Sequence, residues 1–158
     1  MFSYRDVVGP EWRCTPKKCY HVDAGLRNWT EAYHFCHDLE PVTTLAGDKR
    51  PSLLFINTTK EYQVVKSYLR LSGSKVTTTK LTTFAWINCD DNQREGYFIC
   101  NKDITGRGHV APAYWQPGKP DGGSDENCVA MDWRGGFWDD LACNQVHETI
   151  CQIVLNNI

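Results

Sequence analysis

The chain has 158 residues, of which 41% are hydrophobic and 23% are charged, and its formal net charge is -2. This length suits one domain that buries a single core. The mild acidity offers no basic surface for nucleic acid or for an anionic membrane, and no apolar run is long enough to span a bilayer. We therefore expect one globular domain, with no nucleic-acid partner and no membrane insertion by this segment.

The eight cysteines, an even number, indicate disulfides and therefore an oxidising compartment. The residues that follow Met1 do not read as a signal peptide. We expect a secreted protein, or the extracellular domain of a cell-surface protein, without its targeting segment. Asn28 and Asn57 each begin an N-glycosylation sequon, which is consistent with secretion.

The first half of the chain predicts helices. Residues 1–13 lack periodicity and are expected to form an N-terminal tail, followed by one domain over residues 14–158. Segments 28–39 and about 59–71 carry apolar residues at three- and four-residue spacing, which predicts two amphipathic helices. Residues 72–83 are rich in Ser, Thr and Lys and are expected to form a loop.

The second half of the chain predicts short strands. Segments 84–87 and 96–100 flank the turn-rich residues 90–95, which predicts a hairpin. Two further strands are predicted over residues 129–133 and 148–154. Helices that precede strands along the chain indicate the α+β class.

Residues 115–143 are predicted to form a carboxylate-rich loop. Among its acidic residues are Asp121, Asp125, Glu126, Asp139 and Asp140. Carboxylates this dense repel one another unless a cation lies between them, and Ca²⁺ takes roughly six to eight oxygen ligands. The alternative is a solvated acidic loop, as most charge runs are. Closure of the loop by Cys128 and Cys143 and the large aromatic residues inside it argue against that alternative.

The cysteines allow on the order of a hundred pairings, and the sequence alone does not choose among them. Spacing favours two local pairs, a third that would close the acidic loop, and a fourth that would join the first helix to the last strand. These pairs are Cys14–Cys19, Cys89–Cys100, Cys128–Cys143 and Cys36–Cys151. The rival for Cys36 is a zinc site with His34 and His37, but adjacent helix positions point in different directions, and extracellular cysteines usually pair.

With these elements in place, the chain resembles the C-type lectin-like domain over about residues 14–154. The motifs that carry the resemblance are Cys19-Tyr20, Trp29…Cys36, Trp86-Ile87-Asn88-Cys89, Lys119-Pro120-Asp121, Glu126-Asn127-Cys128, Trp138-Asp139-Asp140…Cys143 and Cys151. The resemblance implies two helices flanking antiparallel sheets, a long calcium-binding loop region and the four disulfides above. The Cys14–Cys19 hairpin is similar to the long form of the domain, whereas Cys89–Cys100 is an addition of this chain.

The resemblance also implies the metal sites. A principal calcium would be held by Asp121, Glu126, Asp139 and Asp140, beside a cis peptide bond at Pro120. An auxiliary calcium would fall on Asp91, Glu95, Glu126 and Asn127. Gly122 stands where the family often has another oxygen ligand.

Lys119 departs from the Glu-Pro-Asn or Gln-Pro-Asp triplet of sugar-binding members. A charged ammonium has no lone pair and cannot ligate calcium. Asp139 stands where Asn is usual, so that one positive and four negative side chains leave the same net charge as the usual ligand set. We expect Lys119 to pair with Asp139, and water or a sugar hydroxyl to replace the lost ligand.

The function predicted from this resemblance is calcium-dependent binding of glycans on glycoproteins or cell surfaces, without catalysis. The expected ligand-binding residues are Lys119, Asp121, Glu126, Asp139 and Trp133. Asp121 favours a galactose-type sugar, whereas Lys119 favours an anionic glycan. Trp133 would support the galactose-type sugar; the alternative is that Trp133 only packs on its strand. The alternative is a module that binds a protein receptor, with structural calcium or none. The five histidines lie in no nucleophile motif.

Overall fold

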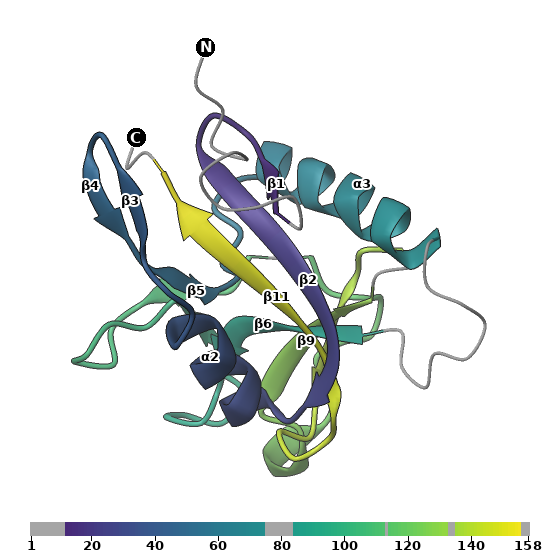
Figure 1. The fold of residues 1–158 in the computed structure, drawn as a ribbon. Coiled ribbons are helices and arrows are strands. Elements are labelled where there is room, and N and C mark those ends of the chain that lie inside the picture. Colours follow the sequence, from purple (N-terminus) through teal and green to yellow (C-terminus); the bar gives the residue numbers. More distant parts are fainter. Residues whose placement is uncertain (1–11, 75–83, 113, 133–134, 156–158) are drawn as a thin grey trace.

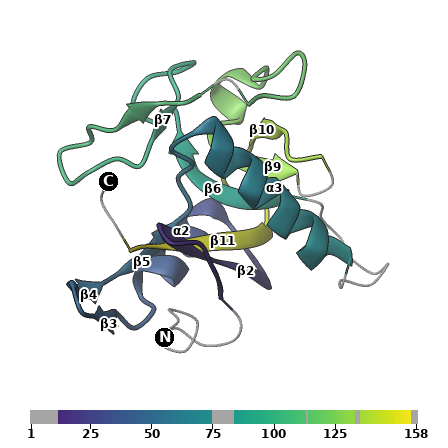
Figure 2. The ribbon, with the colours of Figure 1, turned by 90° about the horizontal axis from the view of Figure 1, so that it is seen from above.

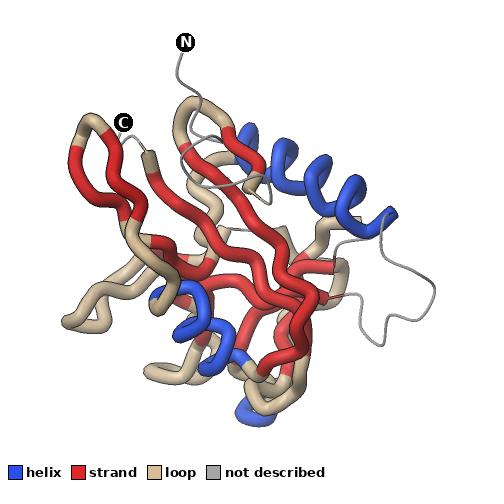
Figure 3. The backbone as a smooth tube through the Cα atoms, in the orientation of Figure 1, coloured by secondary structure: helices blue, strands red, loops and turns tan. Residues whose placement is uncertain are grey.

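The computed structural model describes residues 12–74, 84–112, 114–132 and 135–155, and the statements below concern these residues. Helices α2 (Trp29–His37) and α3 (Thr59–Ser74) lie on two sides of a set of strands (Figures 1 and 3). The α+β class and the two flanking helices are confirmed. The strands are β1 (Arg13–Cys14), β2 (Lys18–Arg27), β3 (Val42–Thr44), β4 (Gly47–Lys49), β5 (Pro51–Leu53), β6 (Phe84–Asp90), β7 (Ile99–Cys100), β8 (His109–Val110), β9 (Cys128–Asp132), β10 (Trp138–Leu141) and β11 (His147–Val154), with a 3-10 turn η1 (Gly123–Asp125).

Strand β11 is the centre of the main sheet. It pairs antiparallel with β2 and β5 and parallel with β6. Strand β9 pairs with β6, and β10 pairs with β9. Figure 2 shows the segment from β7 to β10 on one side of β11 and the β3–β4 hairpin on the other. The acidic segment is therefore carried by β6, β9 and β10, away from that hairpin.

Helix α2 begins with reciprocal hydrogen bonds. The Asn28 side chain accepts from the Glu31 amide at 2.8 Å, and the Glu31 carboxylate accepts from the Asn28 amide at 2.9 Å. Such a capping box satisfies two amides that a helix start would leave unpaired. Ala32 and Cys36 are fully buried on the inner face. The helix predicted over residues 28–39 is confirmed with shorter ends.

Helix α3 begins at Thr59 as predicted, where the Thr58 hydroxyl accepts from the Glu61 amide at 3.1 Å. It continues to Ser74, so the loop predicted over residues 72–83 is wrong for its first three residues. Gly73 reads as a helix breaker in the sequence, but local propensity is a weak signal that the surrounding structure overrides. Residues 75–83 of that predicted loop lie outside the described residues.

Two groups of buried side chains form the core, one on each face of β6. Ala85 and Ile87 belong to one group and Trp86 to the other, because successive strand residues point to opposite faces. The indole Nε1 of Trp86 donates to the Arg27 carbonyl at 2.8 Å. Strand β6 runs to Asp90, three residues past the predicted end at Ile87, and is mostly buried along its length.

Seven of the described strands were not predicted, namely β1, β2, β3, β4, β5, β8 and β10. Strand β2 mixes polar residues such as His21 and Asp23 with apolar ones, and only its first residues are buried, so it shows no clean alternation. Strand β10 lies inside the segment predicted as an acidic loop. Its Asp139 and Asp140 are only 8% and 1% exposed, because β10 pairs with β9 along its length. The loop prediction is therefore wrong for residues 138–141.

All four predicted disulfides are present: Cys14–Cys19, Cys36–Cys151, Cys89–Cys100 and Cys128–Cys143. The zinc alternative for His34, Cys36 and His37 is excluded, because the Cys36 sulfur is bonded to Cys151. Cys89 and Cys100 are directly opposed on β6 and β7, which confirms the predicted hairpin, but its second strand is Ile99–Cys100 rather than residues 96–100. The Cys36–Cys151 bond spans 115 residues. In the chain-entropy model, a loop of this size contributes roughly 4–5 kcal/mol.

The segment predicted as a tail contributes two residues to the folded domain. Arg13 pairs with Tyr20 between β1 and β2. Trp12 is buried and lies 5.4 Å from the His21 ring. Residues 1–11 and 156–158 lie outside the described residues. Among the described helices, none is long and apolar enough to cross a membrane.

Candidate metal and ligand site

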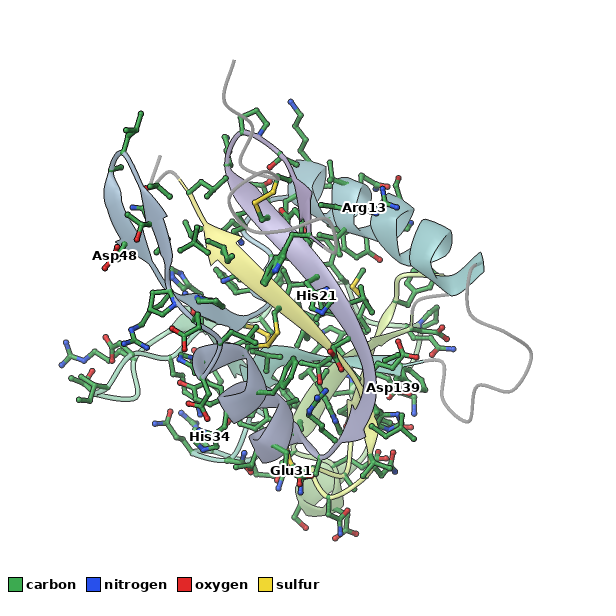
Figure 4. All side chains as sticks on the ribbon, viewed as in Figure 1. Arg13, His21, Glu31, His34, Asp48 and Asp139 are labelled. Atoms are coloured by element: carbon green, nitrogen blue, oxygen red, sulfur yellow. A yellow bond between two sulfur atoms is a disulfide. The ribbon has the colours of Figure 1, made fainter. Side chains whose placement is uncertain are left out.

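Three acidic side chains meet beside β10. Asp139 and Asp140 belong to this strand, and Asp121 comes from the segment between β8 and β9. One carboxylate oxygen from each lies within 4.8 Å of the others. Oxygens that share one Ca²⁺ at roughly 2.3–2.6 Å are at most about 5 Å apart, so this spacing suits a single hard cation. Figure 4 shows Asp139 well away from the labelled His34 and Asp48.

The Asp140 carboxylate holds the neighbouring loop in place. It accepts from the Gly122 amide at 2.7 Å, and both of its oxygens lie 3.1 Å from the Asp121 amide. A buried residue of a sheet strand thus fixes the backbone that carries Asp121. A carboxylate offers roughly four acceptor positions, so these bonds leave capacity for a cation.

Lys119 points into the same cluster. Its Nζ lies 2.8 Å from Asp121 Oδ1 and 3.4 Å from Asp139 Oδ1. The hydrogen bond to Asp121 and the charges of Asp139 and Asp121 raise the pKa of Lys119 well above its usual value. The expected pairing with Asp139 is confirmed, and the contact with Asp121 is the shorter one. The Lys119–Pro120 peptide bond is cis, as the resemblance implies.

One ammonium does not neutralise this cluster. Asp139 Oδ1 is buried and accepts no hydrogen bond, although Lys119 lies near it. Burial raises the pKa of Asp139, against the opposing charge of Lys119. Burial and the charge of Asp140 likewise raise the pKa of Glu126. Burial is the largest cause of both shifts, and the charge of Asp140 adds to them. The residues therefore fit a divalent cation, provided that the ammonium gives way.

Glu126 lies at the edge of the cluster rather than within the group of three. Its side chain covers Gly122, where an added Cβ would lie 2.0 Å from Glu126 Oε1. The space in which the family often has another oxygen side chain is thus filled by Glu126. Of the four predicted principal ligands, the structure brings together Asp121, Asp139 and Asp140 and places Glu126 beside them.

Aromatic residues anchor the segment that carries Lys119. The Trp138 amide donates to the Tyr114 carbonyl, and the Gln116 amide donates to the Trp138 carbonyl, both at 2.9 Å. The rings of Tyr62 and Tyr114 are stacked with centroids 4.1 Å apart. A turn from Gln116 to Lys119 follows directly. Tyr62 and Tyr114 were not predicted as anchors, because their contact joins α3 to a distant segment.

The residues of the predicted auxiliary calcium site also lie together. The Asp91 amide donates to the Asn127 carbonyl at 2.9 Å, and Asp91 Oδ1 and Asn127 Oδ1 are buried without a hydrogen-bond donor. Burial raises the pKa of Asp91. Desolvation and the nearby Asp91 charge raise the pKa of Glu95. Buried oxygens that lack donors are costly, and a hard cation would relieve that cost.

Other predicted residues fall outside this arrangement. Trp133 lies outside the described residues, so its predicted role in ligand binding stays a prediction. Asn57 is exposed, and its Oδ1 accepts from the Lys18 ammonium at 2.8 Å. Asn28 is partly buried at the start of α2. In both residues the side-chain nitrogen is the atom that would carry a glycan, and glycosylation stays a prediction.

The chain matches the family model described as the lectin C-type domain over residues 25–153. The human protein called C-type lectin domain family 17, member A is 27% identical over 96% of this chain. That match covers 34% of the human protein, and the chain spans about a third of the length of several curated relatives and 61% of others.

Two solved structures share the fold. The C-type lectin CEL-I from Cucumaria echinata has a TM-score of 0.73 and is 22% identical, with coverage of 94% of this chain and 98% of that one. The carbohydrate-recognition domain of cow CD23, studied in the presence of a GlcNAc2Man3 oligosaccharide, has a TM-score of 0.68 and is 25% identical. The match covers 94% of this chain and 96% of the CD23 domain.

Proposed function

This chain belongs to the C-type lectin domain family, and we propose that it binds a glycan in a calcium-dependent manner at the face formed by Asp121, Glu126, Asp139 and Asp140. Carbohydrate binding is the general function of the family, and its members generally bind calcium. Its domains are typically extracellular and non-enzymatic.

The carboxylate cluster is the observation that carries the proposal. Three carboxylates lie within one cation's reach, and one buried oxygen of Asp139 has no hydrogen-bond donor. When bound, calcium would supply a positive centre with open coordination positions for sugar hydroxyls. The chain itself supplies the acceptors for the hydroxyl protons, of which Asp121, with 51% of its side chain exposed, is the most accessible.

We propose a galactose-type sugar as the ligand. Asp121 occupies the third position of its triplet, as Asp does in the Gln-Pro-Asp members that the sequence resembles. An anionic glycan would need a free positive charge, whereas the Lys119 ammonium already contacts Asp121 and Asp139. The remaining carboxylates would repel an anion. Anionic ligands therefore require that Lys119 leave its two partners.

One observation favours the alternative of a protein-binding module. Tyr97, Ile104 and Val110 expose 48%, 103% and 63% of their surface in the segment around β7 and β8. Exposed apolar side chains at a shared surface are common in protein interfaces. A receptor bound through this segment would not need calcium at the carboxylate cluster.

A glycan array probed with and without calcium separates the two functions. We expect retention on galactose-terminated glycans in about 10 mM calcium, a concentration chosen above the weak affinities typical of extracellular calcium modules. Retention should be lost in EDTA and in Asp121→Ala. Asp48→Ala, on the exposed β4 strand, is the matched control and should bind like the wild type. Binding to no glycan in calcium would contradict the proposal and favour the protein-binding module.

A further inference from the structure

The Lys119 ammonium uses the same oxygens that a calcium ion would need. Its Nζ contacts Asp121 Oδ1 and Asp139 Oδ1, and both of these residues belong to the group whose oxygens lie within 4.8 Å of one another. The side chain is 26% exposed, so one side of it already borders solvent. Lysine carries four rotatable side-chain bonds and a compact charge, and it changes position at low cost.

The ammonium and a calcium ion cannot occupy this cluster together. Calcium approaches carboxylate oxygens to roughly 2.3–2.6 Å. An ammonium that stays 2.8 Å from Asp121 Oδ1 would then lie within a few ångströms of a doubly charged ion. At such distances like charges repel each other strongly. One cation must displace the other.

We propose that Lys119 is a tethered cation that closes the carboxylate cluster without calcium and is expelled to solvent when calcium binds. The inference rests on the proposed function and describes how the same site is regulated. In the closed state, the ammonium links the segment around Asp121 to β10 through Asp139. In the open state, calcium makes that link, and Lys119 faces the ligand side of the site.

The exchange explains why this cluster remains assembled around a single monovalent charge. Asp140 is held by the Gly122 and Asp121 amides, and this contact does not involve Lys119. The carboxylates of Asp139 and Asp140 are fixed on a paired strand. Only Lys119 has to move, so the site is prepared for calcium. The exchange also limits the binding of anionic glycans, because Lys119 is available to contact them only in the open state.

Chemical labelling of lysines tests the exchange directly. The domain is treated with an amine-acylating reagent in about 10 mM calcium or in EDTA, at matched ionic strength, and labelling is read by peptide mass spectrometry. We expect Lys119 to be labelled several-fold faster in calcium, because its amine no longer lies between two carboxylates. Lys49, on β4 and away from the carboxylates, is the internal control and should not change.

Two substitutions separate charge from side-chain length. Lys119→Met keeps the length and removes the charge, and it should bind calcium about tenfold more tightly, the factor that corresponds to about 1.4 kcal/mol of removed repulsion. Lys119→Arg keeps the charge and should bind calcium no better than the wild type. Calorimetry measures all three proteins with calcium alone.

The outcomes distinguish this inference from the proposed function. Calcium binding with unchanged labelling of Lys119 would overturn the exchange and leave the calcium site standing. Calcium binding to Lys119→Met but not to the wild type would show that Lys119 blocks the site permanently, which would overturn both the exchange and calcium dependence in the natural protein. If neither protein binds calcium, the exchange is wrong, and sugar binding in EDTA then decides whether the domain is still a lectin.

Discussion

Lys18 and Lys119 both bind carboxylates, but they differ in the number of carboxylates that surround the one ammonium. Lys18 is 6% exposed and meets one carboxylate, Glu61, at 3.0 Å. Its ammonium also donates to Phe55 O, Asn57 Oδ1 and Gln152 Oε1 at 2.5–2.8 Å. This group joins β2, α3 and β11, and every charge in it has a partner.

Lys119 meets more negative charge than it can neutralise. Asp121 and Asp139 contact it, Asp140 and Glu126 lie close by, and one Asp139 oxygen has no donor. A balanced pair holds elements together, because removing either partner leaves a buried charge. An excess of carboxylates around a mobile ammonium instead leaves room for a stronger cation. The charge ratio therefore separates a structural lysine from one at a binding site.

The largest effect should come from the balanced pair. In Lys18→Met, the partly buried Glu61, whose side chain is 12% exposed, loses its positive partner, and we expect the free energy of unfolding to fall by about 3–5 kcal/mol. Urea denaturation measures this loss. Lys17→Met, at the neighbouring exposed position, is the control and should change stability by less than about 0.5 kcal/mol. A small loss in Lys18→Met would show that the pair is not structural.

Lys102 tests whether the ratio of carboxylates to ammonium groups or the exposure of the lysine marks a binding site. It pairs one-to-one with Asp90, whose side chain is 1% exposed, but 21% of Lys102 itself is exposed. Lys102→Met should lower the free energy of unfolding by about 1.5–3 kcal/mol, the range for a hydrogen bond to a charged group. Calcium affinity, measured by calorimetry, should stay unchanged. A change in calcium affinity would mean that exposure, not the ratio, marks a binding site.

At the carboxylate cluster, removal of the Lys119 ammonium should strengthen calcium binding. Lys119→Glu with Asp139→Asn brings the ligand set closer to the usual one, removes the ammonium and adds an oxygen ligand. Calcium affinity should rise about tenfold to a hundredfold, or about 1.4–2.8 kcal/mol. Sugar preference on an array should shift towards mannose-type glycans, and binding of the native ligand should fall. A double variant that gains neither calcium nor sugar binding would contradict the lectin function.

Acid should release calcium from the cluster. Carboxylates must be ionised to coordinate, and the pKa values of Asp139 and Glu126 are raised, so protons compete at a higher pH than they would at ordinary carboxyls. We expect calcium affinity to fall by about tenfold between about pH 7 and about pH 4.5, near the reference carboxyl values. Calorimetry at both pH values measures this. Equal affinity would mean that other groups hold the metal.

The helices and the last strands were predictable from local patterns. The apolar spacing and the Asn28 cap define α2, and β9 and β11 lie within one residue of their predicted ends. Strand β2 was not predictable in this way, because its polar residues gain their place through pairing with β11 over its full length. That pairing joins residues more than a hundred positions apart, and no local window contains it.

The candidate site was predictable in its composition and less so in its geometry. The spacing of Asp121, Asp139 and Asp140 indicated the cluster, and the resemblance placed Lys119 beside it. The sequence does not show that Asp139 and Asp140 are buried in a strand, since acidic residues usually mark solvated turns. Nor does it show that Lys119 contacts Asp121 more closely than Asp139, because that depends on the turn that begins at Gln116.

The position of β11 in the chain bears on how the protein is made. This strand is the last of the domain, yet β2, β5 and β6 all pair with it, and it carries Cys151, the partner of Cys36. During synthesis, these three strands leave the ribosome before the strand that joins them exists. Until then they present unpaired edges, which are prone to aggregate. The nascent chain therefore depends on protection of its early strands until the final residues of the domain emerge.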